Sequence, residues 1–309
     1  MADSPTPAST NKAVDYRFRS MIDRGEWVVS VEVDPPKAMD LERGVRIVER
    51  LREAGVDCID AGDSPMASVR MNPVMFSAAI QQRTGVESII HYTSRDRNLM
   101  ALQADLMGAS VVGIRSMIAL SGDPPSLGQY ADASAVWDVR ADGLIEIVAG
   151  LNRGVDSAGN EVGASTDFTI ITSANPNAED LEAEIAKMQM RADRGAHAFF
   201  TQNCFNVEQT ERFLERAEAV GRPVLLGVMP LASARNAQFM ATQVPGVTVP
   251  DGILQRMEAA GDGAAEEGLA IAREYIEATR AGCAGVYLVP ALGRFQGVTQ
   301  LVSELKRQS

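Results

Sequence analysis

Polar residues stand at the ends of several apolar runs in this chain, where they could gather around one site. Glu32 ends such a run and precedes Val33-Asp34-Pro35-Pro36, in which the two prolines stiffen the chain. A carboxyl held there and partly removed from water has a raised pKa, which suits a general acid near neutral pH. Taken alone, Glu32 also fits a solvated carboxylate at the end of a strand.

A second candidate lies in the segment Ser121-Gly122-Asp123-Pro124-Pro125. Gly122 would let a ligand approach the backbone closely, and the prolines would hold the exit of the segment in place. The alternative is an ordinary turn, because Gly-Asp-Pro-Pro is good turn chemistry.

Further run ends carry polar side chains of the same kind. His91 is the one histidine among them, and a packed core histidine remains an alternative to a functional one. Cys204 has no evident histidine base, so we do not expect a nucleophilic role for it. Together the run ends form a set that suits a polar, planar ligand: Glu32, Asp60 with Asp63, His91 with Thr93, Asp123, Ser173 with Asn175, and Gln202.

Eight apolar runs alternate with helical patterns and would position these residues. The runs span 27–33, 56–63, 87–93, 116–123, 167–174, 198–204, 223–231 and 285–291. Eight strands alternating with helices predict a single-domain (β/α)8 TIM barrel, whose active site lies at the carboxyl ends of the strands. A doubly wound sheet is the competing topology, but no G-x-G-x-x-G follows the first strand. Two extra helices, 252–260 and 264–280, are expected between strands seven and eight.

Composition narrows the class of protein. The chain has 309 residues and a formal net charge of -12, which argues against a nucleic-acid partner. Its three cysteines are far apart and predict neither a metal site nor disulfides. We expect residues 1–15 to form a disordered tail and residues 16–309 the barrel. The absence of a signal peptide or membrane segment predicts a cytoplasmic protein, and self-association into a homo-oligomer through the outer helices stays open.

Several segments in the expected order resemble the methylenetetrahydrofolate reductase family, over about residues 27–300. The H-Y-T-x-R-D-R-N, G-D-P-P and T-Q segments are specific as a set. The resembling pieces are VSVEVDPPK, DAGDSPMASVRM, IIHYTSRDRNLMALQADLMG, GIRSMIALSGDPP, SANPNAEDLEAEIAKM, GAHAFFTQNCFN, LLGVMPLASARNAQF and GVYLVPALGRF.

The resemblance implies reduction of 5,10-methylenetetrahydrofolate to 5-methyltetrahydrofolate by NADH or NADPH through a bound flavin, usually FAD, in one-carbon metabolism and methionine biosynthesis. It makes Glu32 the proton donor, and Asp123 a residue that tunes the flavin and binds folate. Gln202 and Arg294 would bind substrate, Arg294 near the folate tail. The implied flavin contacts are His91, Thr93, Gly122, Asp123, Ala141, Asn175 and Arg191; no metal is implied.

The chain departs from the family pattern at Met190, near the flavin diphosphate, and at Ala234, where an aromatic residue is usual. FMN, or direct hydride transfer without a flavin, is therefore an alternative, as is a pterin other than tetrahydrofolate. A non-redox folate-binding or methyl-transfer partner is a third reading. The presence of Glu32, Asp123 and Gln202 argues against it, because binding alone needs no proton donor.

Overall fold

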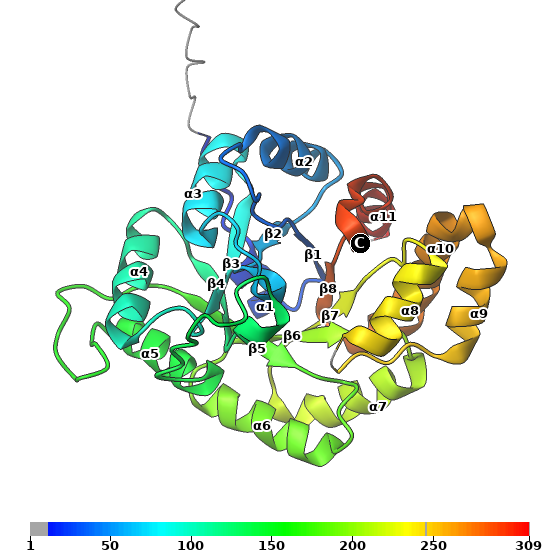
Figure 1. The fold of residues 1–309 in the computed structure, drawn as a ribbon. Helices are drawn as coiled ribbons and strands as arrows, with labels where there is room; N and C mark the ends of the chain where they lie inside the picture. Colours follow the sequence, from blue (N-terminus) through cyan, green and yellow to red (C-terminus); the bar gives the residue numbers. More distant parts are fainter. Residues whose placement is uncertain (1–11, 245, 309) are drawn as a thin grey trace, which may run out of the picture.

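A computed structural model describes residues 12–244 and 246–308, and its centre is a closed barrel of eight parallel strands (Figure 1). Each strand pairs with its neighbours in chain order, and β8 pairs with β1. This confirms the (β/α)8 prediction and excludes the doubly wound sheet. The strands are β1 (Val28–Glu32), β2 (Cys58–Ala61), β3 (Glu87–Thr93), β4 (Ser116–Leu120), β5 (Thr169–Ala174), β6 (Ala198–Asn203), β7 (Val224–Val228) and β8 (Gly285–Leu288).

The helices surround the barrel and lie close to the expected positions. They are α1 (Phe18–Arg24), α2 (Glu42–Glu53), α3 (Pro73–Thr84), α4 (Leu99–Val111), α5 (Ala141–Asn152), α6 (Leu181–Asp193), α7 (Val207–Ala217), α8 (Ala234–Gln243), α9 (Asp251–Ala259), α10 (Ala264–Thr279) and α11 (Phe295–Arg307). Short 3-10 turns include η1 (Pro65–Ala67) and η2 (Pro125–Leu127), which pack on each other.

Local sequence explains where these helices begin and which face they bury. Asn72, Asn98, Asp180 and Asn206 each cap the helix that follows, with the side chain accepting hydrogen bonds from first-turn N–H groups. In α2 the residues Val45, Val48 and Leu51 recur at helical spacing and are buried against the barrel. The capping residues set where a helix begins, and the apolar spacing sets which of its faces packs against the barrel.

The connection from β7 to β8 holds one more helix than the sequence pattern indicated. Helices α9 and α10 match the expected pair, but α8 precedes them and was not predicted. Its ten residues bury only Ala237 and Met240, so the apolar periodicity is too weak to reveal a helix. The three helices stand together on one side of the barrel (Figure 1).

The folded domain begins earlier in the chain than the sequence predicted. Lys12 donates a backbone hydrogen bond to Gln82, and Asp15 donates one to Gly85. Residues 12–15 therefore belong to the folded domain, whereas residues 1–11 of the predicted tail lie outside the described chain. Helix α1, also unpredicted, inserts Phe18 into the bottom of the barrel, where its ring meets Phe200 edge-on at 6.1 Å.

Helix α4 differs from its neighbours in what it shows to solvent. Met100 is 75% exposed and Val111 87% exposed on its outer face. The helix buries Leu102, Leu106 and Ala109 on the opposite side. Among the described helices, none is both long and apolar enough to cross a membrane.

Candidate active site

The carboxyl ends of the first three strands bring Glu32, Asp60 and His91 together. Glu32 and Asp60 are direct partners in the β1–β2 ladder, and His91 stands near the end of β3. One carboxylate oxygen of each acid and one ring nitrogen of His91 all lie within 4.8 Å of one another. Parallel strands in register thus place three ionisable groups at the mouth of the barrel, as the strand-end pattern predicted.

Asp60 is the centre of this group. The hydroxyl of Ser30 donates a 2.6 Å hydrogen bond to its Oδ2, and Nε2 of His91 lies 3.0 Å from its Oδ1. Asp60 is fully buried, while the side chain of His91 retains 16% of its exposure. The histidine is therefore neither a simple core residue nor a free surface group, because it joins a buried carboxylate to the open mouth.

These surroundings shift the protonation of two groups. Burial, together with the charge of Asp34, raises the pKa of Glu32 to about 8. Burial alone would lower the pKa of His91, but the hydrogen bond and charge of Asp60 raise it to about 9. At neutral pH Glu32 then holds a proton and His91 is an imidazolium.

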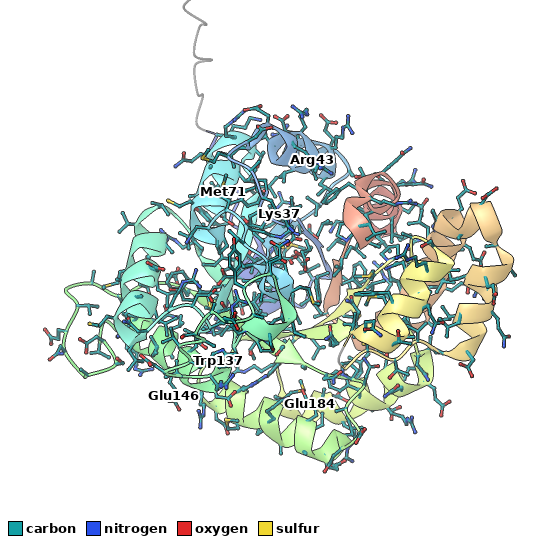
Figure 2. The ribbon with its side chains drawn as sticks, viewed as in Figure 1. Lys37, Arg43, Met71, Trp137, Glu146 and Glu184 are labelled. Atoms are coloured by element: carbon teal, nitrogen blue, oxygen red, sulfur yellow. The ribbon has the colours of Figure 1, made fainter. Side chains whose placement is uncertain are left out.

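Glu32 opens into a cavity of about 700 Å³, the larger cavity hereafter. Its walls mix the apolar Phe239 and Phe295 with three cations, Lys37, Arg43 and Arg70. Arg70 pairs with Asp34 at 3.0 Å. In Figure 2 Lys37 lies toward the centre of the mouth and Arg43 on α2. The cavity therefore suits an extended ligand with an aromatic part and a carboxylate part.

His91 also lines a second cavity of about 340 Å³, the smaller cavity. The amide residues Asn175 and Gln202 line it too, as do Glu184 and Lys187. Its inner wall includes the stacked rings of Phe200 and Tyr287, whose centroids are 4.9 Å apart. Of the predicted site residues, the structure thus brings His91, Asn175 and Gln202 together.

Three other predicted residues, Thr93, Asp123 and Ala141, bind protein partners near the ends of β3 and β4. Thr93 donates from its hydroxyl and its N–H to Asp63, both at 2.9 Å. Asp123 accepts a 2.8 Å hydrogen bond from the N–H of Met66. The N–H of Ala141 donates to the hydroxyl of Ser121.

Gly122 packs against this group with a φ of +81°. A Cβ at that position would come within 3.0 Å of the Cβ atoms of Thr93 and Arg95. The conformation and the close approach to these two side chains both require glycine. The predicted approach of a ligand to this backbone stays a prediction.

The two predicted arginines, Arg191 and Arg294, each donate hydrogen bonds to protein groups. Arg191 donates to Asp142 at 2.6 Å and to the carbonyl of Ser173 at 2.8 Å. Arg294 lines a separate cavity of about 530 Å³ and donates to the carbonyl of Ala232 at 3.5 Å. Neither arginine lines the larger or the smaller cavity, so their ligand roles stay predictions.

Sequence reasoning missed Arg70 and Lys37 as site residues, and it placed Asp60 in the strand-end set without its contact to His91. Asp60 was visible as a strand-end carboxylate, but its link to His91 joins the neighbouring strands β2 and β3 and depends on their register. Lys37 follows the Pro35-Pro36 pair, and that position was a usable signal. Arg70 comes from the loop before α3, whose path no local pattern predicts.

The smaller cavity and the Glu32 group differ in what they could hold. The smaller cavity lies within the 300–1,000 Å³ range of ligand pockets and has the aromatic floor and convergent amides that a planar ring needs. It fits the ring portion of a flavin. The cations for a diphosphate are less free, because Lys187 pairs with Glu184 and Arg191 with Asp142. The Glu32 group offers three ligand atoms within 4.8 Å of one another, so the absence of a metal there stays a prediction.

Comparison with known proteins matches residues 17–291 to the family described as methylenetetrahydrofolate reductase. The chain is 28% identical over 235 residues to a 5,10-methylenetetrahydrofolate reductase of Pectobacterium carotovorum subsp. carotovorum, covering 74% of this chain and 72% of that protein. It is 25% identical over 254 residues to a probable methylenetetrahydrofolate reductase (NADPH) of Caenorhabditis elegans, of which it covers 36%.

Among solved structures, one of an uncharacterized protein from Clostridium thermocellum superposes with a TM-score of 0.67 at 14% identity, covering 94% of this chain and 99% of that one. That protein binds two copies of 5-methyl-5,6,7,8-tetrahydrofolic acid. At this identity the likeness concerns the fold alone.

Proposed function

Because the chain belongs to the methylenetetrahydrofolate reductase family, we propose that it reduces 5,10-methylenetetrahydrofolate to 5-methyltetrahydrofolate at the mouth of the barrel. The electron donor is NADH or NADPH, and the relatives' names include an NADPH and an NADH form. The reaction belongs to one-carbon metabolism, and we assign it to the cytoplasm and to methionine biosynthesis.

One observation carries the assignment of the proton donor. Glu32 combines a pKa of about 8 with a place on the wall of the larger cavity. A carboxyl that keeps its proton at pH 7 can protonate a ring nitrogen of the substrate and so open the methylene bridge to an electrophilic iminium. A non-redox folate-binding protein would have no use for such a group.

The other residues bind and orient. Lys37 and Arg43 offer cations to the carboxylates of the folate tail in the larger cavity, and Arg294 extends this positive side from the neighbouring cavity. Gln202 presents its amide to the substrate ring from the smaller cavity. Self-association into a homo-oligomer is compatible with this arrangement.

We propose FAD as the cofactor. When bound, it supplies a redox ring that takes hydride from the nicotinamide and passes it to the substrate. His91 and Asn175 would hold the ring in the smaller cavity. Thr93, Gly122, Asp123 and Ala141 would line its edge at the ends of β3 and β4, and Arg191 would share its guanidinium between Asp142 and a phosphate.

A second candidate is direct hydride transfer from nicotinamide to folate without a flavin. The observation that favours it is the internal pairing of Lys187 with Glu184 and of Arg191 with Asp142. Met190 adds no polar group to the same helix. These features weaken the attraction for a diphosphate.

The test is the visible absorption spectrum of the purified protein, with any released cofactor identified by mass. A flavin spectrum that bleaches with NADH or NADPH and recovers with methylenetetrahydrofolate supports the flavin enzyme. A colourless protein that still oxidises nicotinamide with the folate supports direct transfer. A protein that oxidises no nicotinamide under either condition contradicts the proposed reaction.

A further inference from the structure

We propose that Asp60 is a positioning residue: it holds the imidazolium of His91 beside Glu32, where the cation stabilises the carboxylate that Glu32 becomes after giving up its proton. The inference rests on the proposed role of Glu32 as proton donor. It adds two residues to the proton chemistry, Asp60 and Ser30, and gives His91 a second role beside that of a flavin contact.

Two buried residues hold the imidazole ring of His91 from the side of the barrel core. Ser30 and Asp60 are both fully buried, and the hydroxyl of Ser30 holds one carboxylate oxygen at 2.6 Å. The other oxygen is then aimed at Nε2 of His91, 3.0 Å away. With both oxygens committed, Asp60 has one orientation, and so has the imidazole ring that it binds.

The other side of the His91 imidazole faces the smaller cavity. His91 lines the smaller cavity, and among the described residues its Nδ1 has no hydrogen-bond partner. A histidine kept only for packing would be buried on all sides. Here one nitrogen is held by a buried carboxylate, while the ring itself lies at the boundary between the groups around Glu32 and the ligand space.

The charges around Glu32 show why the pair matters. Glu32 faces Asp60 of β2, His91 of β3 and Asp34 beyond the end of β1. Both acids raise its pKa, whereas His91 and Arg70 lower it. Lys37 acts on Asp34, and the phenol of Tyr287 on β8 has its pKa raised by burial and by Glu32.

Asp60 and His91 thus act on Glu32 with opposite signs. If His91 were neutral, the buried Asp60 carboxylate would oppose ionisation of Glu32 without compensation. Glu32 would become a weaker acid. With His91 protonated, the pair is neutral, and the nearby cation lowers the cost of the Glu32 carboxylate.

The proton balance of the reaction shows when the Glu32 carboxylate needs the cation of His91. The proton of Glu32 ends on N10 of the folate as the bond from the bridging carbon to N10 breaks. The hydride ends on the same carbon, which becomes the N5 methyl group. Glu32 remains as a carboxylate beside His91 until water returns a proton, so the stabilised state occurs once in every turnover.

The first experiment is an NMR titration of the two histidines in the whole protein. His91 is expected to titrate near pH 9, and His197, which burial holds near 4, is an internal reference. In Asp60→Asn, which keeps an acceptor for Ser30, the midpoint of His91 should fall by about one to three units. An unchanged midpoint would overturn the proposal. This measurement needs no turnover, so it is independent of the proposed function.

The second experiment compares pH profiles of kcat for the wild type, His91→Gln and the double variant Asp60→Asn/His91→Gln. In the single variant the Asp60 carboxylate has no imidazolium beside it, so the pKa of Glu32 should rise. The alkaline limb of the kcat profile should therefore move to higher pH. Its kcat at pH 7 should fall by up to about tenfold for each unit of the shift, with KM little changed. The double variant removes both charges and should return the limb toward the wild type.

The matched control is His197→Gln, on the far side of the barrel from this group, which retains an acceptor for the N–H of Ile170. It should leave the pH profile unchanged. If His91→Gln has the wild-type limb, or if the double variant behaves as the single one does, the Asp60–His91 pair does not act on Glu32. A wild type without any reductase activity, by contrast, refutes the proposed function and leaves the NMR result standing.

Discussion

Glu32 has two properties that seldom occur together in a carboxyl group, a raised pKa and access to a large cavity. Both follow from its place at the end of β1, where the barrel wall removes water from one side of the side chain. Replacing Glu32 by Gln keeps the shape and removes the proton. We expect folate reduction to fall by about 10²–10⁴-fold, while reduction of bound flavin by nicotinamide continues. Stopped-flow measurement of the two half-reactions checks this, and equal losses in both would contradict it.

The same residue predicts a dependence of stability on pH. Its pKa rises from 4.5 in the unfolded chain to about 8 in the folded protein. Its contribution to stability is therefore fully present below about 4.5 and is lost as the pH rises through 8. Glu32→Gln should lack this loss and be more stable than the wild type at pH 8. Denaturant titrations at pH 5 and pH 8 measure the difference, and a wild type that loses nothing relative to the variant would count against the shifted pKa.

At the level of single residues, sequence alone predicted that Glu32, His91, Asn175 and Gln202 lie at the mouth of the barrel, because strand ends in a barrel converge. It did not predict that Asp60 binds His91. That contact joins two residues 31 positions apart in the chain and depends on how their strands are staggered.

At the level of elements, α10 shows how packing can overrule helix propensity. Gly268 lies inside this helix, and a Cβ there would come within 1.9 Å of the carbonyl oxygen of Leu231. Gly268→Ala should therefore destabilise the protein by about 1–3 kcal/mol through overpacking. Gly108 in α4 has nothing within 4 Å of its Cβ position, so Gly108→Ala should stabilise by about 0.5–1 kcal/mol. Urea denaturation of both variants checks the opposite signs; two changes of the same sign would contradict the packing argument.

The elements that sequence failed to predict share a physical cause. Helices α1 and α8 are short, with seven and ten residues, and bury only three and two residues, so their apolar repeats are too brief to stand out in the sequence. Strands and long amphipathic helices were predicted closely because each carries its own apolar repeat. Helix α2, with three buried residues at helical spacing, is such a case.

At the level of the whole molecule, an ion pair ties the last helix to the first half of the barrel. Lys306 of α11 binds both oxygens of Asp57, which precedes β2 and is itself buried. Asp57 also accepts the N–H of Val29. Lys306→Gln should leave the buried carboxylate partly unpaired and lower the free energy of unfolding by about 1–3 kcal/mol.

The control for that variant is Lys12→Gln, which breaks the exposed pair with Glu49. Its effect should stay below about 1 kcal/mol. Thermal unfolding of both proteins separates the two cases. Equal effects would show that the ion pair between α11 and the residue before β2 contributes no more than an ordinary surface pair.

The uneven covering of the barrel gives the methionines very different access to oxidants. Met39 and Met100 stand in water, whereas Met117, Met188 and Met257 are fully buried. Sulfoxide formation follows exposure, so brief treatment with peroxide should add oxygen to the first two sulfurs long before the other three. Because Met100 lies on the exposed face of α4, its rate of oxidation reports whether that face is open to solvent. The rate would fall if another molecule covered the helix.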